Sequence, residues 1–478
     1  MGLKVTSYNL STFSGDPFLR MDFDYLEITK ELNISREVPR LKKFITLLET
    51  GHPITKEDYY LDGKSDYIHI VVRNIKGGEL HLSNPIYIND DKGEELNKHK
   101  LVKGEIVIAI SASCGASFIY NGSNDDVQLT LSHYLAKLKV NESKINPTLL
   151  VYYLNSGIMQ KYFRSTETGK TQKNLSKYYI RELPMLIPED VKEQLRIANK
   201  IAPLDIEIKQ LKTQIKPDAE IINEIFTKRF GWDTAKFIEL KSIHLIIGTF
   251  SAFSNNIDNR FSFKFHNKAG EYVSNILKSQ TSKRIKDFLA EDITLGKSIS
   301  PTDYYENGEQ FYVSMADIKN WCFETEEAKT VLQSYFDANQ NKRIALNDII
   351  MARSGEGTIG KVAIIDNEEN EAVYADFTMR IRFKDYNPTF AYYYFRTDFF
   401  QYLIYTNKKG LGNNTNIFPS QVRELPVPDI SLNEQNRIVN EIKSETDKQR
   451  VFDKKIAEKK RQIDLLVQNA IYKFYKPS

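Results

Sequence analysis

The sequence has very little cysteine: only Cys114 and Cys322 in 478 residues. Two cysteines cannot form a disulfide framework, and such scarcity is typical of proteins in a reducing cytosol. The chain also lacks any apolar run near the roughly 18–20 residues that cross a bilayer, and no basic-then-apolar leader is recognisable. We therefore expect a cytoplasmic protein with no membrane partner.

Signatures of catalysis and of metal binding are missing as well. The seven histidines include no i, i+4 pair and the two cysteines lie far apart, so no metal site is expected. Neither a Gly-x-Gly-x-x-Gly cofactor loop nor the Asn- or Asp-Pro-Pro-aromatic motif of an amino-methyltransferase is present. The sequence therefore predicts a non-catalytic chain that binds no cofactor of its own.

Two stretches imitate catalytic motifs. Gly355 to Lys361 has the spacing of a phosphate-binding loop, but Val362 stands where a magnesium-binding hydroxyl is needed and a strand-like run follows. We interpret it as a glycine turn between strands. Asp429, Glu441 and Lys443 imitate a metal-nuclease triad, yet Glu441 and Lys443 fall inside a predicted helix, whereas that chemistry places its acidic residues around magnesium on strands.

The overall composition is typical of a globular protein with more than one domain. A chain of 478 residues exceeds one usual core, and its 41% apolar and 27% charged residues lie far from disordered compositions. The formal net charge of +3 neither requires nor excludes a polyanionic partner, because local patches decide phosphate binding.

A long internal repeat organises the chain. Arg-Glu-Leu-Pro at 181–184 recurs at 423–426, and a Glu-Gln pair follows each copy, at 193–194 and 434–435. Further matches, such as Gly51 with Gly296, lie 241 to 245 residues apart throughout the two halves. The chain therefore consists of two copies of one unit of roughly 240 residues.

Each copy predicts the same order of elements. A strand-rich body comes first, and a helix follows Asn-Pro at 146–147 or 387–388. A polar, glycine-containing loop and the extended Arg-Glu-Leu-Pro segment come next, and a long helix ends the copy. In the second copy Ser431 is the predicted N-cap, with Glu434 completing a capping box. The predicted fold class is α+β.

The two long helices carry apolar residues spaced alternately three and four apart, which is typical of a helix that packs against another helix. The economical arrangement pairs them as an antiparallel coiled coil, and Pro203 and Pro217 should kink the first helix. The alternative, that each helix packs only on its own domain, stays open. The predicted seam residues are Ile197, Ile201, Leu204, Ile208, Leu211, Ile215, Ile438, Ile442, Phe452, Ile456, Ile463 and Leu466.

The repeated segments, together with Asp348-Ile349-Ile350, Ala352 to Gly355 and Gly360 to Ala363, carry a family resemblance. The doubled unit resembles the specificity (S) subunit of type I restriction-modification enzymes over nearly the whole chain. One departure is Cys114-Gly115-Ala116, which replaces the Gly-Lys-Val of the second copy, so the turn of the first domain is expected to differ in shape.

The resemblance implies a domain organisation. Residues 1–188 and 231–429 would be two target-recognition domains, and 189–230 and 430–474 would be the two long spacer helices. Each domain would read one half of a bipartite, asymmetric site in double-stranded DNA. The helices would dock two DNA adenine methyltransferase (M) subunits, and motor-nuclease (R) subunits would join the bacterial or archaeal complex where they exist. S-adenosylmethionine, ATP and magnesium would then belong to those partner subunits.

Polar loop residues that differ between the copies are the candidates for contacts with DNA. Arginine can bind guanine and Asn or Gln adenine through two hydrogen bonds, whereas Lys and Ser more often hold phosphate. In the first domain the candidates are Arg73, Ser111, Ser113, Lys170, Gln172, Lys173 and Asn174. In the second domain they are Arg353, Ser354, Glu356, Thr358, Lys408, Lys409, Asn413, Asn414 and Asn416.

Other functions stay open at this stage. The chain could be an S-like subunit of another restriction complex or of a methylation-only complex. It could also be a two-domain scaffold that binds only protein, or a self-sufficient nuclease that uses the acidic triad. Binding to DNA would separate the first two readings from the scaffold, and magnesium-dependent cutting by the isolated chain would favour the nuclease.

Overall fold

The computed structural model describes residues 23–35, 37–60, 65–122, 127–166, 174–247, 249–254, 260–306, 308–355, 357–369, 371–410 and 415–474. Contacts divide the chain into two compact units. Unit 1 comprises Met1–Gln214 and Phe452–Ser478, and unit 2 comprises Ile215–Val451. Within the described ranges no helix is both long enough and apolar enough to span a bilayer.

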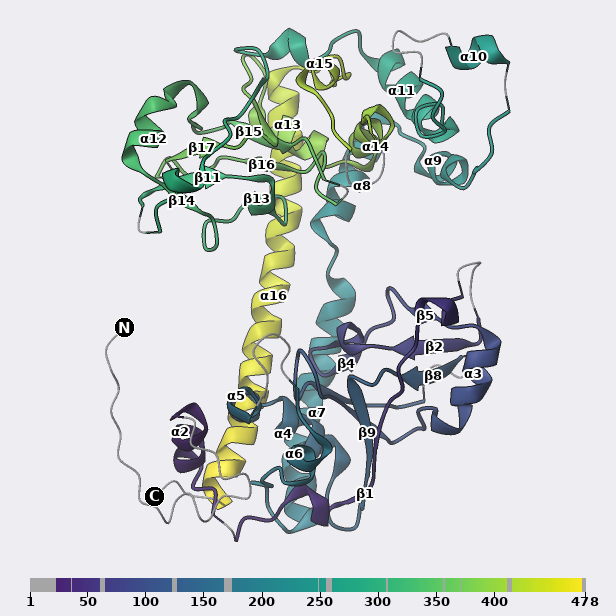
Figure 1. The fold of residues 1–478 in the computed structure, drawn as a ribbon, viewed down its shortest axis with the longest axis vertical. Helices are drawn as coiled ribbons and strands as arrows, with labels where there is room; N and C mark the ends of the chain where they lie inside the picture. The colour runs from purple at the N-terminus through teal and green to yellow at the C-terminus, as the bar shows by residue number, and fades with distance from the viewer. Residues whose placement is uncertain are drawn as a thin grey trace. The chain divides into compact units, whose positions relative to one another are not determined.

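Unit 1 contains a four-stranded antiparallel sheet of order β1-β9-β6-β7 (Figure 1). A second sheet has the order β5-β2-β8, with β2 and β8 parallel, and β3 pairs with β4. In the following list η marks a short 3-10 helix. The elements are α2 Phe23–Glu31, η1 Leu41–Lys43, β1 Ile45–Thr50, η2 Lys56–Asp58, β2 Tyr67–Ile70, η3 Val72–Asn74, β3 Ile75–Lys76, β4 Glu79–Leu80, β5 Ile86–Tyr87, α3 Asp90–Leu96, η4 Asn97–His99, β6 Ile106–Ala109, β7 Ser117–Ile119, β8 Gln128–Leu131, β9 Leu135–Val140, α4 Pro147–Asn155, α5 Gly157–Thr166, α6 Lys177–Arg181 and α7 Val191–Gln214.

Unit 2 repeats this plan, which confirms the predicted duplication and the α+β class. Its larger sheet has the order β10-β18-β15-β16, its second sheet the order β14-β11-β17 with β11 and β17 parallel, and β12 pairs with β13. The elements are α8 Asp218–Phe230, α9 Thr234–Lys241, α10 Phe250–Ser254, α11 Lys268–Gln280, η5 Ile285–Phe288, β10 Thr294–Leu295, η6 Pro301–Asp303, β11 Gln310–Val313, η7 Met315–Asp317, β12 Ile318–Lys319, β13 Cys322–Phe323, β14 Thr330–Val331, α12 Gln333–Ala338, η8 Gln340–Lys342, β15 Ile349–Ala352, β16 Val362–Ile364, β17 Ala372–Tyr374, β18 Thr378–Ile381, α13 Pro388–Phe395, α14 Asp398–Asn407, α15 Pro419–Val422 and α16 Leu432–Phe474.

The repeated Glu-Gln pair fastens the long helix to the Asn-Pro helix. The buried side chain of Gln194 accepts a hydrogen bond from the backbone N of Asn146 at 2.6 Å and donates to the carbonyl of Pro188 at 2.8 Å. In unit 2 Gln435 accepts from the backbone N of Asn387 at 2.8 Å and donates to the carbonyl of Ile430 at 2.9 Å. Buried amides need such partners, so the conserved spacing of the two copies serves the fold.

The Arg-Glu-Leu-Pro segment closes each unit in the same manner. The hydroxyl of Tyr153 donates to the carbonyl of Pro184 at 2.6 Å, and Tyr394 donates to Pro426 at 2.8 Å. Each proline also forms an isolated antiparallel bridge, Arg40 with Pro184 and Arg284 with Pro426. The repeated motif therefore has a structural role in both units, where it binds segments of the same unit that are distant in sequence.

The first long helix, predicted over 189–230 with kinks at Pro203 and Pro217, is divided into two helices at the second proline. Helix α7 ends at Gln214 and α8 begins at Asp218, because Pro217 lacks an N–H and its ring clashes with the preceding turn. Pro203, by contrast, lies inside α7. The second helix, α16, is unbroken over 43 residues, and the backbone N of Glu434 donates to the hydroxyl of the predicted cap, Ser431, at 3.3 Å.

The long helices belong to the two units instead of forming separate domains. In unit 1, α7 and the second part of α16 run antiparallel, as ion pairs of Glu193 with Lys473 at 3.2 Å and of Glu207 with Lys459 indicate. In unit 2, α8 and the first part of α16 also run antiparallel, because Arg229 pairs with Glu434 and the N of Lys216 donates to Gln449 at 3.0 Å. All the predicted seam residues are buried or half-buried. The helix faces also pack on the body of their own unit, because each apolar stripe is wide enough to contact both.

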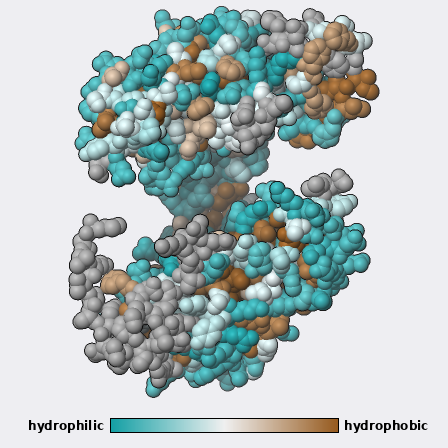
Figure 2. Space-filling view, viewed as in Figure 1, coloured by the Kyte–Doolittle hydropathy of each residue, from teal (hydrophilic) through white to brown (hydrophobic). Residues whose placement is uncertain are grey.

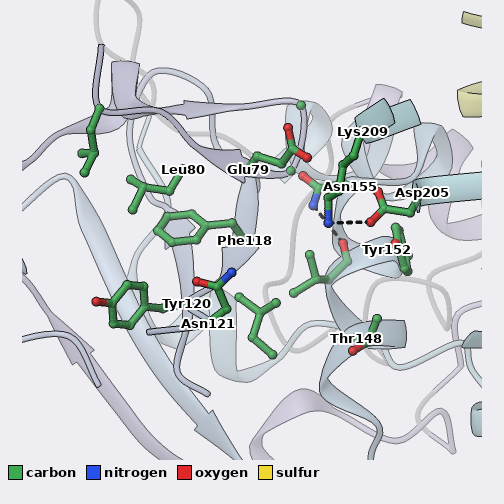
Figure 3. Close-up of a pocket in the computed structure, with 15 residues that line it drawn as sticks. Glu79, Leu80, Phe118, Tyr120, Asn121, Thr148, Tyr152, Asn155, Asp205 and Lys209 are labelled. Atoms are coloured by element: carbon green, nitrogen blue, oxygen red, sulfur yellow. Dashed lines mark hydrogen bonds and ion pairs between the residues drawn. The ribbon is translucent and has the colours of Figure 1, made fainter. Parts of the chain in front are cut away.

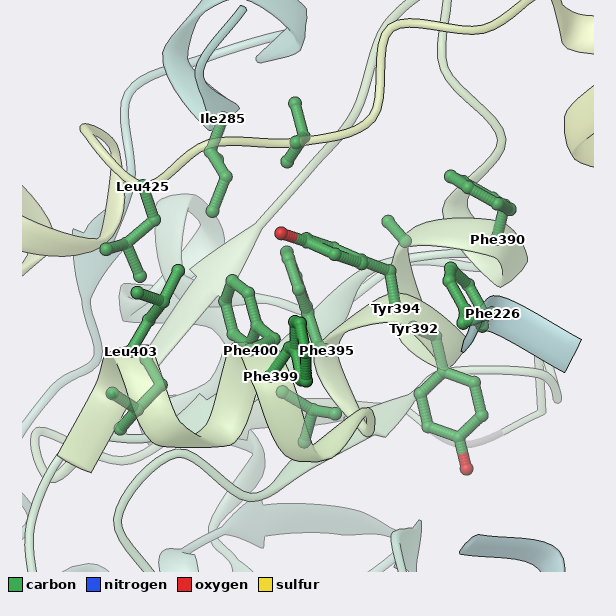
Figure 4. Close-up of a cluster of buried hydrophobic side chains, with 14 of the residues drawn as sticks. Phe226, Ile285, Phe390, Tyr392, Tyr394, Phe395, Phe399, Phe400, Leu403 and Leu425 are labelled. Carbon is green, nitrogen blue, oxygen red and sulfur yellow. The ribbon is translucent and has the colours of Figure 1, made fainter. Parts of the chain in front are cut away.

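Aromatic residues dominate the core of unit 2. Figure 4 shows Tyr394, Phe395, Phe399 and Phe400 from α13 and α14 pointing into one cluster, and the rings of Phe395 and Phe400 stack with centroids 4.4 Å apart. Phe226 joins this cluster from α8, with its ring 5.4 Å from that of Phe390. This packing holds α8 against the body of its own unit.

Not all apolar side chains of unit 2 are buried. Figure 2 shows apolar surface near α10, where the exposed fractions are 73% for Leu245, 88% for Ile247 and 77% for Phe250. Ile238 in α9 is 66% exposed. Contiguous exposed apolar surface of this kind usually marks a contact with another molecule.

Candidate nucleic-acid interface

The structure brings the two predicted loops of unit 2 together. Arg353 follows β15 directly and begins the glycine turn that leads to β16. Ser354 forms an antiparallel bridge with Asn416, and Asn416 forms a second bridge with Lys409. The backbone N of Ile417 donates to the carbonyl of Arg353 at 2.9 Å. Loops that lie about 60 residues apart in the sequence therefore form one surface.

Unit 1 has the same junction with different side chains. Ser111 bridges Asn174, and the backbone N of Leu175 donates to the carbonyl of Ile110 at 2.8 Å. Ile110 of unit 1 is equivalent to Arg353 of unit 2, because each residue follows an inner strand of its four-stranded sheet. The N–H of Ile110 donates to the carbonyl of Tyr134 in the β8–β9 turn, and the N–H of Arg353 donates to the carbonyl of Phe377 in the β17–β18 turn. One scaffold thus presents two chemically different surfaces.

Arg353 has the clearest geometry for reading a base. Its guanidinium lies between two phenylalanine rings, 5.7 Å from the centroid of Phe377 and 5.6 Å from that of Phe418. Both rings are exposed, at 45% and 38%. Stacking on aromatic faces restricts an arginine while leaving the edge of its guanidinium able to bind guanine. Its Nε is buried and has no hydrogen-bond partner among the described residues.

The sequence did not point to the aromatic residues at this surface. Phe377 and Phe418 were not among the candidates, and neither was Tyr134, which is 38% exposed at the matching turn of unit 1. A usable signal was present, since Tyr134 and Phe377 occupy equivalent repeat positions. Exposed aromatic rings can stack on bases, but their exposure only became apparent in the fold.

The remaining candidates divide by exposure. Ser113, Asn174 and Arg73 are exposed, the last in η3. Ser111 is only 2% exposed and Lys408 only 4%, so neither side chain is accessible at the surface of this structure. In unit 2 Ser354, Thr358, Lys409 and Asn416 are half-buried, and the Thr358 hydroxyl donates to the carbonyl of Ser354 at 2.7 Å. Lys170, Gln172, Lys173, Glu356, Asn413 and Asn414 lie outside the described residues.

The structure explains both stretches that imitate catalytic motifs. Gly355 and Gly360 adopt φ of +88° and +83° in the tight turn between β15 and β16, so this segment connects two strands and precedes no helix that could hold a phosphate. Glu441 and Lys443 lie inside α16, whereas Asp429 precedes it. These positions do not provide the strand pair that a metal nuclease requires.

A cavity of about 560 Å³ opens in unit 1 beside β4, β7, α4 and α7 (Figure 3). Its charged residues are Glu79, Asp205 and Lys209, and Lys209 pairs with Asp205 at 2.8 Å. Burial, and then the neighbouring Asp205, raises the pKa of Tyr152, so its hydroxyl stays protonated. Glu79 pairs in turn with Lys212, so the charges at this cavity compensate one another and offer no net positive surface to a phosphate backbone.

A family profile described as the type I restriction modification DNA specificity domain matches residues 35–219 and 277–458. The chain belongs to this family. The two matches fall on the two repeats, and the family is a recognition component of restriction-modification systems.

Solved structures of specificity subunits align along most of the chain at low identity. The S subunit from M. genitalium is 14% identical, with a TM-score of 0.42 and coverage of 91% of this chain and 97% of that one. A chain from a study of type I R-M complex assembly is 14% identical, with a TM-score of 0.44 and coverage of 91% of this chain and 98% of that one. HsdS from Thermoanaerobacter tengcongensis is 14% identical, with a TM-score of 0.32 and coverage of 92% of this chain and 96% of that one. Among curated proteins, the sequence has no match.

Proposed function

We propose that each unit of this type I specificity subunit reads one half of a bipartite, asymmetric site in double-stranded DNA. One observation carries the proposal: the same junction of loops occurs in both units but presents different side chains, Ile110 in one and Arg353 in the other. Equal scaffolds with unequal reading surfaces suit two different half-sites at a fixed spacing.

The long helices would set that spacing and dock the partners. Helix α16 has 43 residues, which corresponds to about 65 Å, whereas one turn of B-DNA is about 34 Å. Besides the docking on the long helices, we assign the exposed apolar surface around Leu245, Ile247 and Phe250 to a second contact with a methyltransferase subunit, because such surface usually marks a protein interface. Methyl transfer, translocation and cutting, with S-adenosylmethionine, ATP and magnesium, are assigned to the partner subunits.

Mapping of methylated adenines in cells with and without this chain tests the proposal. A two-part motif with a fixed gap should appear only when the chain is present. A continuous motif, or an unchanged methylation pattern, would contradict it, and in the second case the protein-scaffold alternative would gain support.

Arg353→Lys tests the reading surface of unit 2. Lysine keeps the charge but cannot form the paired contact with guanine, so discrimination at one position should fall by about 1–3 kcal/mol. The methylation motif should relax in one half only. Arg450→Lys is a matched control, because it is the same substitution at an exposed arginine of α16, and relaxation of both halves by Arg353→Lys would contradict the assignment.

A further inference from the structure

Three side chains that bind metals come together in unit 1. Glu49 lies in β1, His52 follows that strand, and His99 ends η4. Their nearest donor atoms all lie within 4.8 Å of one another, and the two imidazole centroids are 4.2 Å apart. The three residues line one small cavity together with Thr130 and Lys137.

One donor atom of this group is unsatisfied. Nε2 of His52 is buried and has no hydrogen-bond partner among the described residues, whereas Nδ1 of His99 is hydrogen-bonded to Glu49. An unpaired buried polar atom in a folded protein requires an explanation, such as a water or an ion that the protein binds. A metal ion at this point would use the free lone pair.

The strand register shows which residues of unit 2 occupy the positions of Glu49, His52 and His99. Glu49 pairs with Lys137, and Thr294 pairs with Arg380. His52 forms a parallel bridge with Ser132, as Lys297 does with Ala375, and Lys342 ends η8 as His99 ends η4. In the second copy Thr294, Lys297 and Lys342 therefore stand at the positions of Glu49, His52 and His99.

In unit 2 a lysine ammonium lies at this place. Nζ of Lys342 donates to the carbonyl of Leu295 at 2.7 Å and lies 5.8 Å from the centroid of the Tyr374 ring. The lysine thus connects η8 to the edge strand β10. Unit 1 has no lysine at either histidine position, and there the side chains of Glu49 and His99 connect β1 to η4 by their hydrogen bond.

We propose that Glu49, His52 and His99 bind a zinc ion that connects β1 to η4 in unit 1. Two imidazoles, one carboxylate and an open position for water are a common zinc ligand set. Bonds of about 2.0–2.1 Å bring tetrahedral ligands to about 3.4 Å from one another. Donor atoms that now lie up to 4.8 Å apart would close by as much as about 1.4 Å, whereas the hydrogen-bonded atoms of Glu49 and His99 would separate, and rotation of the side chains can supply both changes. Lys137 lies 3.8 Å from Glu49, but its charge is balanced by Glu105 at 3.4 Å.

The proposal departs from the absence of a metal site expected from the sequence. The spacing conceals the group, because His52 and His99 are 47 residues apart and meet only after η4 folds against β1. No part of the proposal depends on DNA recognition.

Zinc content of the full-length chain tests the site. The chain, loaded with zinc and dialysed against metal-free buffer, should retain one ion, and His99→Lys should retain none because it copies the residue of unit 2. His81→Gln, a histidine of the same unit outside the group, is the matched control and should retain one. Cobalt in place of zinc should give the visible absorption of a four-coordinate site in the wild type and not in His99→Lys.

Two further measurements exclude a folding artefact. Glu49→Gln, a smaller change, should also lose the ion, and hydrogen exchange of the β6 and β9 amides should show that both variants remain folded. Chelation should speed exchange in β1 and η4 of the wild type. A wild type that retains no zinc, or a His99→Lys variant that retains as much as the wild type, would overturn the proposal.

Discussion

Replacing Gln435 by methionine should destabilise unit 2 by about 2–3 kcal/mol. The glutamine is 2% exposed, accepts from the backbone N of Asn387 at 2.8 Å and donates to the carbonyl of Ile430 at 2.9 Å. Methionine has nearly the same length and shape but makes neither hydrogen bond. The variant therefore removes polar contacts with little change in packing.

The magnitude follows from the groups that lose their partner. The N–H of Asn387 and the C=O of Ile430, both in half-buried residues, would each lose its partner, at about 1–3 kcal/mol each. The apolar side chain of methionine regains about 1–2 kcal/mol by its own burial. With central values of about 2 kcal/mol for each group and about 1.5 kcal/mol for methionine, the predicted loss in the free energy of unfolding is about 2.5 kcal/mol.

Tryptophan fluorescence during urea unfolding isolates the effect. Both tryptophans of the chain, Trp232 and Trp321, lie in unit 2, so their signal reports on that unit. Gln340→Met is the matched control, because this glutamine is exposed in the same unit, and it should change stability by less than about 0.5 kcal/mol.

Gln435→Glu adds a pH signature. The introduced carboxyl keeps an acceptor for Asn387, but only its protonated form can donate to Ile430. Burial raises the pKa of this carboxyl in the folded state, so folding takes up a proton and the variant gains stability as the pH falls. Its deficit relative to the wild type should shrink between pH 8 and pH 5. Equal losses for Gln435→Met and Gln340→Met, or a deficit independent of pH, would refute the role given to the Glu-Gln pair.

Three further outcomes are expected. Gly296→Ala should destabilise unit 2 by about 3 kcal/mol or more, because a Cβ would lie 2.0 Å from the carbonyl oxygen of Tyr374. Gly357→Ala is the control and should be nearly neutral in the same fluorescence assay, because no atom lies within 4 Å of its Cβ. Burial, and then neighbouring His133, lowers the pKa of His69 to about 4 from 6.5, so about 3 kcal/mol of stability present above pH 6.5 should be lost as the pH falls through 4. Hydrogen exchange in β2 and β8 would follow that loss, and His69→Gln should abolish the pH dependence. Tyr394→Phe, which removes the hydroxyl that binds the carbonyl of Pro426 at 2.8 Å, should lower the free energy of unfolding by about 1–3 kcal/mol. An unchanged midpoint of urea unfolding would contradict the structural role of the Arg-Glu-Leu-Pro segment.

The sequence by itself determined the duplication, the order of elements and the buried seams of the long helices. These features are local or periodic: the Asn-Pro cap of α13 requires only that the side chain of Asn387 accept from the N of Phe390 three residues later, and apolar residues at helical spacing define a face whatever they pack against. The family resemblance was also carried by the order of short motifs. The break at Pro217 was indicated by the sequence, but a kink was expected in place of two helices.

Only the tertiary structure decided what each motif does. The glutamine of each Glu-Gln pair forms hydrogen bonds with backbone groups as far as 50 residues away, and Arg353 lies against the rings of two other loops. The exposure of Phe377, the burial of Lys408 and the meeting of Glu49 with His99 are likewise products of strand register. Side chains distant in sequence are brought together by folding, and no local pattern records which of them will meet.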